Sequence, residues 1–519
     1  MQCILALLTS TNMKKYISVS TIILSLIFLP FNLLLAQQWT QIGSDIDGED
    51  AFNNSGHSIS MNDGGTSLII GAPGNGDSFS GAGHARVYEL NNGAWQQKGA
   101  DIDGEAEYDG SGISVAMNAE GNIVAVGAVS NSDGGSGAGH VKVYEWNGDA
   151  WVQKGTDIDG DAAYSESGNA IEFSSDGNTL VIGASKSDVA ASNAGHVRVY
   201  EWDTSDWVQK GLSMNGDDAN NSFGYAVSIS SDGNCIGIGS PLNSGGFVQG
   251  GQVKVFEWNG SAWNLKGTAL YGADNFDLFG FSVSLSADGN TIAIGAIMHY
   301  NLGADVGHVR VYKWESSAWE QKGADIDGEA ADDNSGSSLS ISNDGNILAI
   351  GARGNDGTFG FNSVAGHVRV YLWYNDAWAQ FGDDIDGESD SDFSGQSVAL
   401  SADGSSLAIG ADWNSGNGTS SGHVRVWAAP IFVNIAEKEF TSAIQLYPNP
   451  TNGSFFINFN QMYSGVEILV RNTLGQIIST NVYSSIQTAQ VELIGQTGIY
   501  FVEVRSKESM PVIFRLMKE

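Results

Sequence analysis

Residues 281–296 read FSVSLSADGNTIAIGA, and after a glycine-rich stretch residues 308–314 read HVRVYKW. The first run alternates polar and apolar side chains up to a short turn at 287–290, and an apolar run follows that turn. This pattern predicts two antiparallel strands joined by a tight turn, with a third, β-branched and aromatic strand at 308–314. A turn at 315–317 then returns the chain through 318–322 as a fourth strand. The stretch therefore predicts a four-stranded antiparallel unit.

The unit recurs along most of the chain. Tryptophans are spaced by 56 residues, with one interval of 59, at Trp39, Trp95, Trp151, Trp207, Trp263, Trp319 and Trp378. Two glycine ladders, which start at Gly56 and Gly83, keep the same period. Four-stranded units at this period are typical of propeller blades, and we interpret the tryptophans as packing residues of the outer strands. The sequence predicts an all-β, seven-bladed β-propeller over 38–429.

The two ends of the repeat region complement each other. The first repeat begins with an extra strand at Trp39, and the last repeat ends at Trp427 without its outer strand. We expect the N-terminal strand to complete the last sheet and close the ring, because closure removes exposed sheet edges.

Several repeats carry a recognisable motif. Phe223-Gly and Phe279-Gly precede alternating strands, Ile70-Gly-Ala-Pro73 follows a turn, and Gly-His-Val-Arg-Val-Tyr strands come next. These features resemble the FG-GAP repeats of integrin α-subunit propellers and their bacterial relatives. Most repeats have Ser-Gly in place of Phe-Gly, and turns such as 286–289 are too short for the integrin-type calcium loop. The resemblance implies a propeller and carries over no calcium site.

The N-terminus is typical of an export signal. Lys14 and Lys15 precede an apolar run from Ile17 to Leu35, and Ala36 offers a cleavage point before a polar continuation. We expect residues 1–36 to be a signal peptide, with translation starting at Met1 or Met13, and no permanent membrane span.

The C-terminal part has a different composition. Residues 430–443 read as a linker, and the segment 444–519 contains Leu446-Tyr-Pro-Asn-Pro, Leu474-Gly-Gln476 and Thr497-Gly-Ile-Tyr-Phe-Val502. In this order the motifs resemble the type A sorting domain of type IX secretion. The resemblance implies an interaction with that secretion machinery, outer-membrane passage to the cell surface or the medium, and removal of the domain afterwards. Its alternating strands with proline and glycine at the turns predict a small β-sandwich.

Charge and cysteine content exclude some functions. The net charge of −36 would repel a phosphate backbone, so we expect no nucleic-acid partner. Of the two cysteines, Cys3 lies in the predicted signal peptide and Cys235 in an apolar run, which predicts a buried, unreactive thiol.

The connection between repeats carries an acidic motif, Asp-Ile-Asp-Gly followed by Glu or Asp. Oxygen ligands at alternating positions suit Ca²⁺, although aspartates also cap turns through their own side chains and the order of an EF-hand is not met. The candidate metal ligands are Asp45, Asp47, Asp101, Asp103, Asp157, Asp159, Asp325, Asp327, Asp384 and Asp386. The histidines that begin the third strands occupy one repeated position, which favours a scaffold role: His84, His140, His196, His308, His367 and His423.

Departures from the repeat predict where a ligand binds. A selective site on near-identical blades needs local difference, and blades four to six supply it in loops of one face. The candidate ligand-binding residues are Tyr271, His299, Tyr300 and Phe361.

We expect a secreted or cell-surface protein for binding or adhesion, with an extracellular protein or polysaccharide as its ligand and no required cofactor. Catalysis needs a localised set of different groups, and the carboxylates occur in too many copies to nominate a pair. The alternatives are an extracellular glycosidase or lyase on the same scaffold and a structural surface-layer component.

Overall fold

The computed structural model describes residues 38–298, 305–357, 363–430, 444–472, 477–506 and 509–519. The predicted signal peptide and most of the predicted linker lie outside these residues. The chain divides into two compact units, up to Pro430 and from Ile431 onward, which are described separately. The described residues form β-strands and turns without an α-helix.

Sheet 1 shows how one repeat folds. β3 (Ser58–Met61), β4 (Ser67–Ala72), β5 (His84–Asn91) and β6 (Ala94–Gln97) pair in this order, all antiparallel. A fifth strand, β7 (Ile102–Asp103), extends the predicted four. It forms because β6 pairs only with the last half of β5 and leaves the edge at His84 and Ala85 open, where β7 pairs.

The next five sheets repeat this arrangement. Sheet 2 contains β8 (Ser111–Met117), β9 (Ile123–Ala128), β10 (His140–Trp146), β11 (Trp151–Gln153) and β12 (Ile158–Asp159). Sheet 3 contains β13 (Ala170–Phe173), β14 (Thr179–Ala184), β15 (His196–Trp202), β16 (Trp207–Gln209) and β17 (Met214–Asn215). Sheet 4 contains β18 (Val227–Ile229), β19 (Cys235–Ser240), β20 (Gln252–Trp258), β21 (Trp263–Leu265) and β22 (Leu270–Tyr271). Sheet 5 contains β23 (Ser282–Leu285), β24 (Thr291–Ala296), β25 (His308–Glu315), β26 (Ala318–Gln321) and β27 (Ile326–Asp327). Sheet 6 contains β28 (Ser335–Ile341), β29 (Ile347–Ala352), β30 (His367–Tyr374), β31 (Ala377–Gln380) and β32 (Ile385–Asp386).

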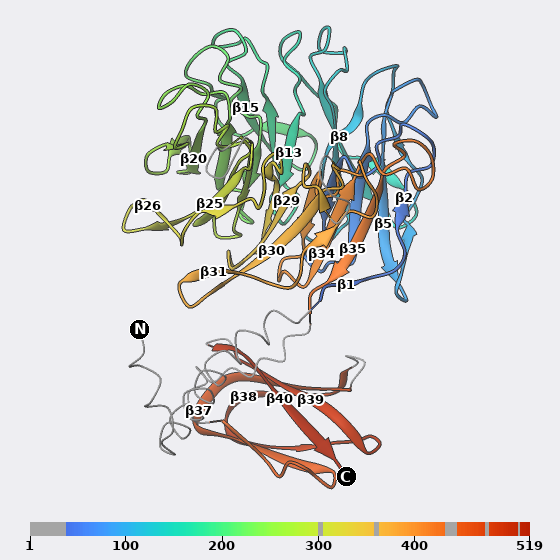
Figure 1. The fold of residues 1–519 in the computed structure, drawn as a ribbon, viewed down its shortest axis with the longest axis vertical. Coiled ribbons are helices and arrows are strands. Elements are labelled where there is room, and N and C mark those ends of the chain that lie inside the picture. The colour runs from blue at the N-terminus through green and yellow to red at the C-terminus, as the bar shows by residue number, and fades with distance from the viewer. Residues whose placement is uncertain (1–37, 299–304, 358–362, 431–443, 473–476, 507–508) are drawn as a thin grey trace, which may run out of the picture. The chain divides into compact units, whose positions relative to one another are not determined.

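Sheet 7 combines the two ends of the repeat region. β33 (Ser397–Leu400), β34 (Ser406–Ala411) and β35 (His423–Ala428) pair in order, and β1 (Thr40–Gln41) and β2 (Ile46–Asp47) add to β35. In Figure 1 the blue strand β2 accordingly lies near the orange strand β35. The seven antiparallel sheets fit a seven-bladed propeller.

Backbone hydrogen bonds connect each sheet to the next at the turns between its first two strands. In each turn one N–H donates to a carbonyl in the following sheet, and the last donates back to Asp63 in sheet 1. The residues in order are Asp63, Ala119, Ser175, Ser231, Ala287, Asn343 and Ala402. The first strands of the sheets also contact their successors, and β33 of sheet 7 contacts β3 of sheet 1.

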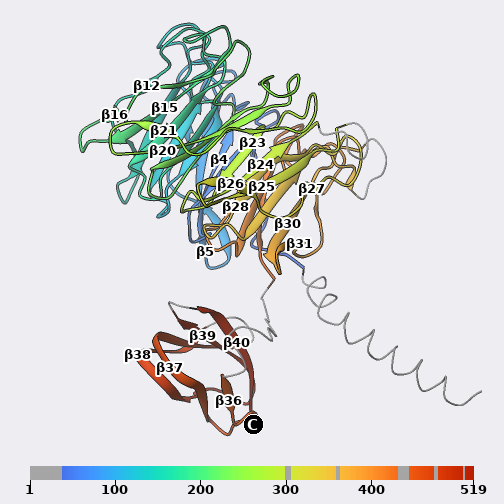
Figure 2. The same cartoon turned by 90° about the vertical axis from the view of Figure 1, so that its left-hand side faces the viewer.

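The tryptophan ladder also connects neighbouring sheets. Each indole N–H donates to a backbone carbonyl of the preceding sheet, as Trp151 does to Lys98 (2.7 Å) and Trp39 does to Phe381 (2.9 Å). The glycine before each third strand has a left-handed φ, +74° at Gly83, and a Cβ there would lie 2.1 Å from the carbonyl oxygen of Ser111 in the next sheet. Apolar clusters fill the space between adjacent sheets (Figure 2 shows the sheets from a second side). The repeat therefore specifies contacts between sheets as well as strands.

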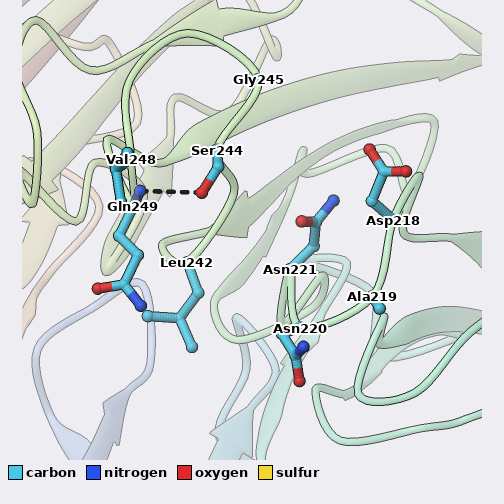
Figure 3. Close-up of a pocket in the computed structure, with 9 residues that line it drawn as sticks. All are labelled: Asp218, Ala219, Asn220, Asn221, Leu242, Ser244, Gly245, Val248 and Gln249. Atoms are coloured by element: carbon cyan, nitrogen blue, oxygen red, sulfur yellow. Dashed lines mark hydrogen bonds between the residues drawn. The ribbon is translucent and has the colours of Figure 1, made fainter.

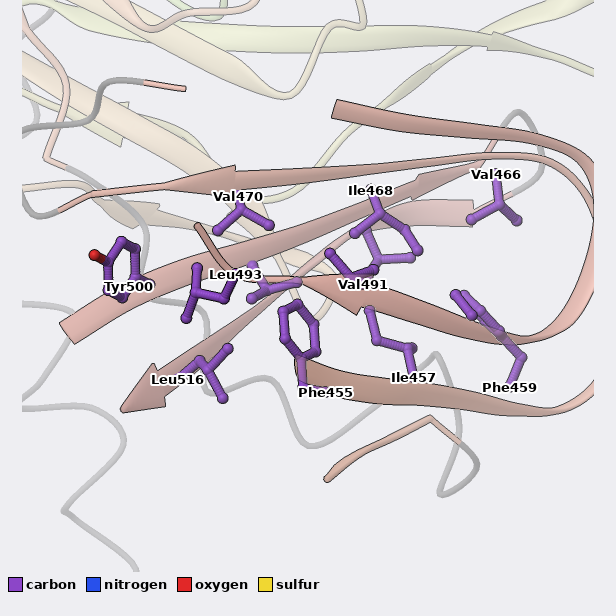
Figure 4. Packing of buried hydrophobic residues seen from close by; sticks show 13 residues of the cluster. Phe455, Ile457, Phe459, Val466, Ile468, Val470, Val491, Leu493, Tyr500 and Leu516 are labelled. Atoms are coloured by element: carbon purple, nitrogen blue, oxygen red, sulfur yellow. The ribbon is translucent and has the colours of Figure 1, made fainter. Parts of the chain in front are cut away.

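The C-terminal unit is one sheet of β36 (Gln445–Tyr447), β37 (Ser454–Arg471), β38 (Ile477–Glu492), β39 (Gly498–Ser506) and β40 (Ser509–Lys518). The sequence predicts a sandwich, whereas these strands share a single hydrogen-bonded sheet. The register of β37 against β38 shifts between Asn458 and Tyr463, so the side chains that face the core change from odd to even positions. Phe455 and Ile457 before the shift and Ile468 and Val470 after it therefore belong to one buried cluster (Figure 4).

Candidate functional site

The predicted ligand-binding residues are only partly described. His299, Tyr300 and Phe361 lie outside the described residues. Tyr271 lies in β22, where the sequence predicts a loop, because β22 pairs with the open edge of β20. Its side chain is 43% exposed, and its hydroxyl accepts a hydrogen bond from Nε2 of Gln252 (3.0 Å). In the repeated arrangement these two positions are His and Asp, so this pair is a local replacement.

A pocket of about 350 Å³ lies at the junction between sheets 3 and 4. One side comes from the connection between β17 and β18, and the other from the loop between β19 and β20 (Figure 3). Its lining residues are Asp218, Ala219, Asn220, Asn221, Leu242, Ser244, Gly245, Val248 and Gln249. Tyr271 adjoins it, since a Cβ at Gly245 would lie 3.2 Å from Cε1 of Tyr271.

The pocket is lined mainly by uncharged hydrogen-bonding groups. Asn221 is buried, while Asn220 is exposed in a left-handed conformation (φ 60°) that asparagine tolerates. The backbone N–H of Gln249 donates to the hydroxyl of Ser244 (3.0 Å), which fixes the loop between β19 and β20 on its side of the pocket. Leu242 and Val248 add apolar surface. Such a mixture suits a ligand with several hydroxyl groups and an apolar face.

The predicted metal ligands divide into two sets. The first aspartate of each motif accepts a hydrogen bond through Oδ1 from a glutamine four residues earlier, with N···O distances of 2.5–2.7 Å; these are Asp45, Asp101, Asp157, Asp325 and Asp384. The second aspartate of each motif ends a two-residue strand, and these are Asp47, Asp103, Asp159, Asp327 and Asp386. The alternating aspartates thus have separate structural surroundings.

Four of the first aspartates lie close to a histidine and to a glutamate from the preceding sheet. The groups are Glu49–His84–Asp101, Glu105–Asp133–His140–Asp157, Glu329–His367–Asp384 and Glu388–His423–Asp45, and in each the candidate ligand atoms lie within 4.8 Å of one another. From the sequence we interpret the histidines as scaffold residues and the acids as a separate motif. The sequence does not predict that these three residues lie close together, because the glutamate comes from the preceding sheet. The sequence signal for their proximity is that all three recur with the repeat.

A cation on the third strand spans each of these junctions. At the junction of sheets 7 and 1, Nη2 of Arg86 donates to the backbone carbonyl of Asp47 (2.8 Å), and Nη1 lies 3.4 Å from Oε1 of Glu49. Arg369 and Arg425 repeat both contacts. The acidic motif therefore stabilises the contact between sheets.

Burial controls the charge of the histidines in these groups. Desolvation lowers the pKa of His84 and of His140, and it lowers the pKa of His367 to about 3 and that of His423 to about 4. Each imidazole is therefore neutral at pH 7.

The first strands carry a second departure from the repeat. Serine hydroxyls at this position accept a backbone N–H from the next sheet, as Ser60 does from Met117 (3.0 Å) and Ser228 does from Leu285 (2.9 Å). In sheet 3 the acceptor is Oε2 of Glu172, 3.1 Å from the backbone nitrogen of Ile229. Burial raises the pKa of Glu172 to about 7. Glu172 is not among the candidate residues predicted from the sequence. The signal that could have found it is a carboxylate at a position where the equivalent strands have serine or alanine.

A comparison with family models matches residues 445–518 to the secretion system C-terminal sorting domain. This confirms the predicted sorting domain, and it implies export through type IX secretion to the cell surface or the extracellular space. Within the residues that the structure describes, no helix has the length and apolarity needed to cross a membrane.

Comparisons with whole proteins add little. No curated protein matches the chain. Among solved structures, it is similar to a protein of Bacteroides uniformis named as a 6-phosphogluconolactonase, with 10% identity, 82% of this chain and 99% of that chain covered, and a TM-score of 0.47. It is also similar to Chaetomium thermophilum Raptor, with 10% identity, 76% of this chain and 29% of that chain covered, and a TM-score of 0.49. Neither similarity bears on function.

Proposed function

We propose that this exported protein is a closed seven-bladed propeller of the FG-GAP type that binds a neutral saccharide in the pocket between sheets 3 and 4. The observation that carries the proposal is the pocket itself, which lies where the repeat loses its charged motif. The backbone hydrogen bond from the N–H of Ala402 to the carbonyl of Asp63 supports ring closure.

The lining favours a polyhydroxylated ligand. Asn220, Asn221 and Gln249 each offer both a donor and an acceptor, which matches sugar hydroxyls. The exposed ring of Tyr271 beside Gly245 offers an apolar surface on which the C–H face of a sugar can stack. Asp218 is the one carboxylate among the lining residues, so a highly charged ligand has little to pair with.

Binding without turnover follows from the same lining. Glycoside hydrolysis generally uses two carboxyl groups that flank the scissile bond. The nine lining residues include a single carboxyl group and no histidine. We therefore favour a binding or adhesion function over a glycosidase or lyase.

The test is retention of the purified protein on a panel of neutral polysaccharides, with an assay for new reducing ends. We expect retention without turnover, and Tyr271→Ala to weaken binding about tenfold as a partly buried aromatic anchor. Tyr164→Ala is the matched control, because Tyr164 is 68% exposed at the junction of sheets 2 and 3 and is not among the residues that line the pocket. Equal effects of the two substitutions, or release of reducing ends, would contradict the proposal.

A further inference from the structure

We propose that three consecutive sheet junctions each bind one divalent transition-metal cation of the Zn²⁺ class through a glutamate, a histidine and an aspartate. The sites are Glu329–His367–Asp384 between sheets 5 and 6, Glu388–His423–Asp45 between sheets 6 and 7, and Glu49–His84–Asp101 between sheets 7 and 1. The proposal is independent of the saccharide pocket.

The junction of sheets 7 and 1 shows the donor geometry. Nδ1 of His84 lies 3.9 Å from Oε2 of Glu49 and 3.7 Å from Oδ2 of Asp101. These separations are too long for hydrogen bonds, but ligand atoms around a tetrahedral Zn²⁺ at about 2.1 Å are roughly 3.4 Å apart. The junction of sheets 6 and 7 has the same arrangement, with 3.9 and 4.0 Å from Nδ1 of His423 to Asp45 and Glu388.

At the junction of sheets 7 and 1 the histidine provides an independent sign of a missing partner. His84 is 1% exposed, and its Nδ1 has no hydrogen-bond partner among the described residues. A buried nitrogen of this kind ordinarily forms a hydrogen bond or binds a metal. Here the atoms that it faces are carboxylate oxygens, and a cation between them would satisfy all three groups.

The surrounding residues hold the ligands by their other atoms. Arg86 contacts Oε1 of Glu49 and leaves Oε2 toward His84. Gln97 donates to Oδ1 of Asp101 (2.5 Å) and leaves Oδ2 toward the same histidine. Contacts of this kind orient the ligands in protein metal sites.

Two other junctions show that this position accepts a positive charge. Between sheets 4 and 5 the glutamate position is Ala273, and Arg310 instead donates to Oδ2 of Asp325 from both Nε (2.9 Å) and Nη2 (2.7 Å). Between sheets 1 and 2 the ammonium group of Lys142 contacts Glu105 and lies 3.3 Å from Oδ2 of Asp157. At the three proposed sites the arginine contacts Oε1 of the glutamate, so Oε2 and the aspartate Oδ2 remain for an external cation.

The donor set selects the metal. Ca²⁺ prefers oxygen ligands in larger number, whereas one imidazole with two carboxylates suits Zn²⁺ and related ions. The site also excludes the second aspartate of each motif, in contrast to the calcium expectation from the sequence.

The experiment is calorimetric titration of the chelator-treated, full-length protein with Zn²⁺ and separately with Ca²⁺, followed by thermal melting. We expect saturable Zn²⁺ binding with a rise in melting temperature, and Ca²⁺ binding at least about tenfold weaker. Asp101→Asn keeps the shape of the side chain and leaves the buried histidine in place, and it should remove one of the three equivalents of bound Zn²⁺.

His196→Gln is the matched control, because that junction has Asp161 near the histidine but Ser213 in place of the aspartate. It should leave the Zn²⁺ stoichiometry unchanged, whereas His84→Gln should lower it by one. If His84→Gln proves unstable, Asp101→Asn decides the question alone. Unchanged stoichiometry in Asp101→Asn, or Ca²⁺ binding as tight as Zn²⁺ binding, would overturn the proposal.

Discussion

The junction of sheets 7 and 1 and the junction of sheets 3 and 4 have the same backbone arrangement and opposite chemistry. At the first, the carboxylates of Glu49 and Asp101 lie beside the buried imidazole of His84, and Arg86 spans the two sheets. At the second, the histidine position is Gln252 and the first aspartate position is Ala269. The charges at the second junction are reduced to one ion pair (2.6 Å), in which Lys254 is mostly buried and Asp217 is exposed.

The difference shows that the packing of adjacent sheets does not require the charged motif at every junction. The backbone hydrogen bonds between turns continue through sheets 3 and 4, and so do those from the indoles, as the indole N–H of Trp263 donates to the carbonyl of Lys210 (2.8 Å). Because these contacts hold the sheets together, the side chains of one junction were able to change. The pocket lies where they changed.

The largest expected effect is on stability, and it differs between Arg86 and Lys254, the cations that span the two junctions. Arg86→Met should lower the free energy of unfolding by about 3 kcal/mol, because Arg86 is 5% exposed and its loss leaves Glu49 and the carbonyl of Asp47 without their partner. Lys254→Met should cost about 1 kcal/mol or less, since Asp217 is 51% exposed and solvent replaces the cation. Urea unfolding of both variants measures this, and equal costs would contradict the distinction between the junctions.

An intermediate effect concerns pH and the departure at Glu172. The folded protein keeps the proton of Glu172 up to a pKa of about 7, against 4.5 for a free glutamic acid side chain. The folded state binds more protons between these values, so this contribution to stability is full below pH 4.5 and is lost as pH rises through 7.

Glu172→Gln keeps an oxygen acceptor for the N–H of Ile229 and removes the charge. The variant should be more stable than the parent by about 2 kcal/mol at pH 8 and similar to it at pH 4.5. Unfolding at the two pH values measures the difference, with the exposed Glu201→Gln as control. A variant with the same pH dependence as the parent would show that Glu172 titrates normally.

The smallest expected effect is on stability at Tyr271. Tyr271 is 43% exposed, and among the described residues its hydroxyl accepts a hydrogen bond from Gln252, so Tyr271→Ala should change the free energy of unfolding by about 0.5 kcal/mol or less. Thermal melting of Tyr271→Ala beside Tyr164→Ala checks this. A cost of several kcal/mol would mean that Tyr271 supports the fold of the altered junction rather than a ligand.

The repeat made much of the fold predictable. The alternation in 281–285, the turn at 287–290 and the apolar run after it correspond to β23, β24 and the turn between them. The spacing also predicted that the strand after Trp39 pairs with the last repeat, because that repeat lacks the outer strand that the others have, and β1 does pair with β35. The fifth strand was not predicted, because two residues such as Ile102 and Asp103 are too few to show the alternation of apolar and polar side chains that indicates a strand.

The site was less predictable for a different reason. Proximity across a junction, as between Glu49 and His84, depends on how sheets twist against each other, and strand patterns do not encode this angle. The substitution of Gln252 for histidine was visible in the sequence, and only its contact with Tyr271 links it to a pocket. In the C-terminal unit the register shift after Asn458 made one sheet enclose a core for which two sheets were predicted.

The sharing of sheet 7 between the two ends of the repeat region sets an order of folding. Gln41 pairs with Trp427, so β1 has no strand partner until the last repeat is present. Closing a flexible loop of that length would cost roughly 5 kcal/mol of chain entropy. Sheets 1 to 6 form from local contacts and bring the two ends together beforehand, which removes most of that cost. We therefore expect the pairing of β1 with β35 to form last in refolding.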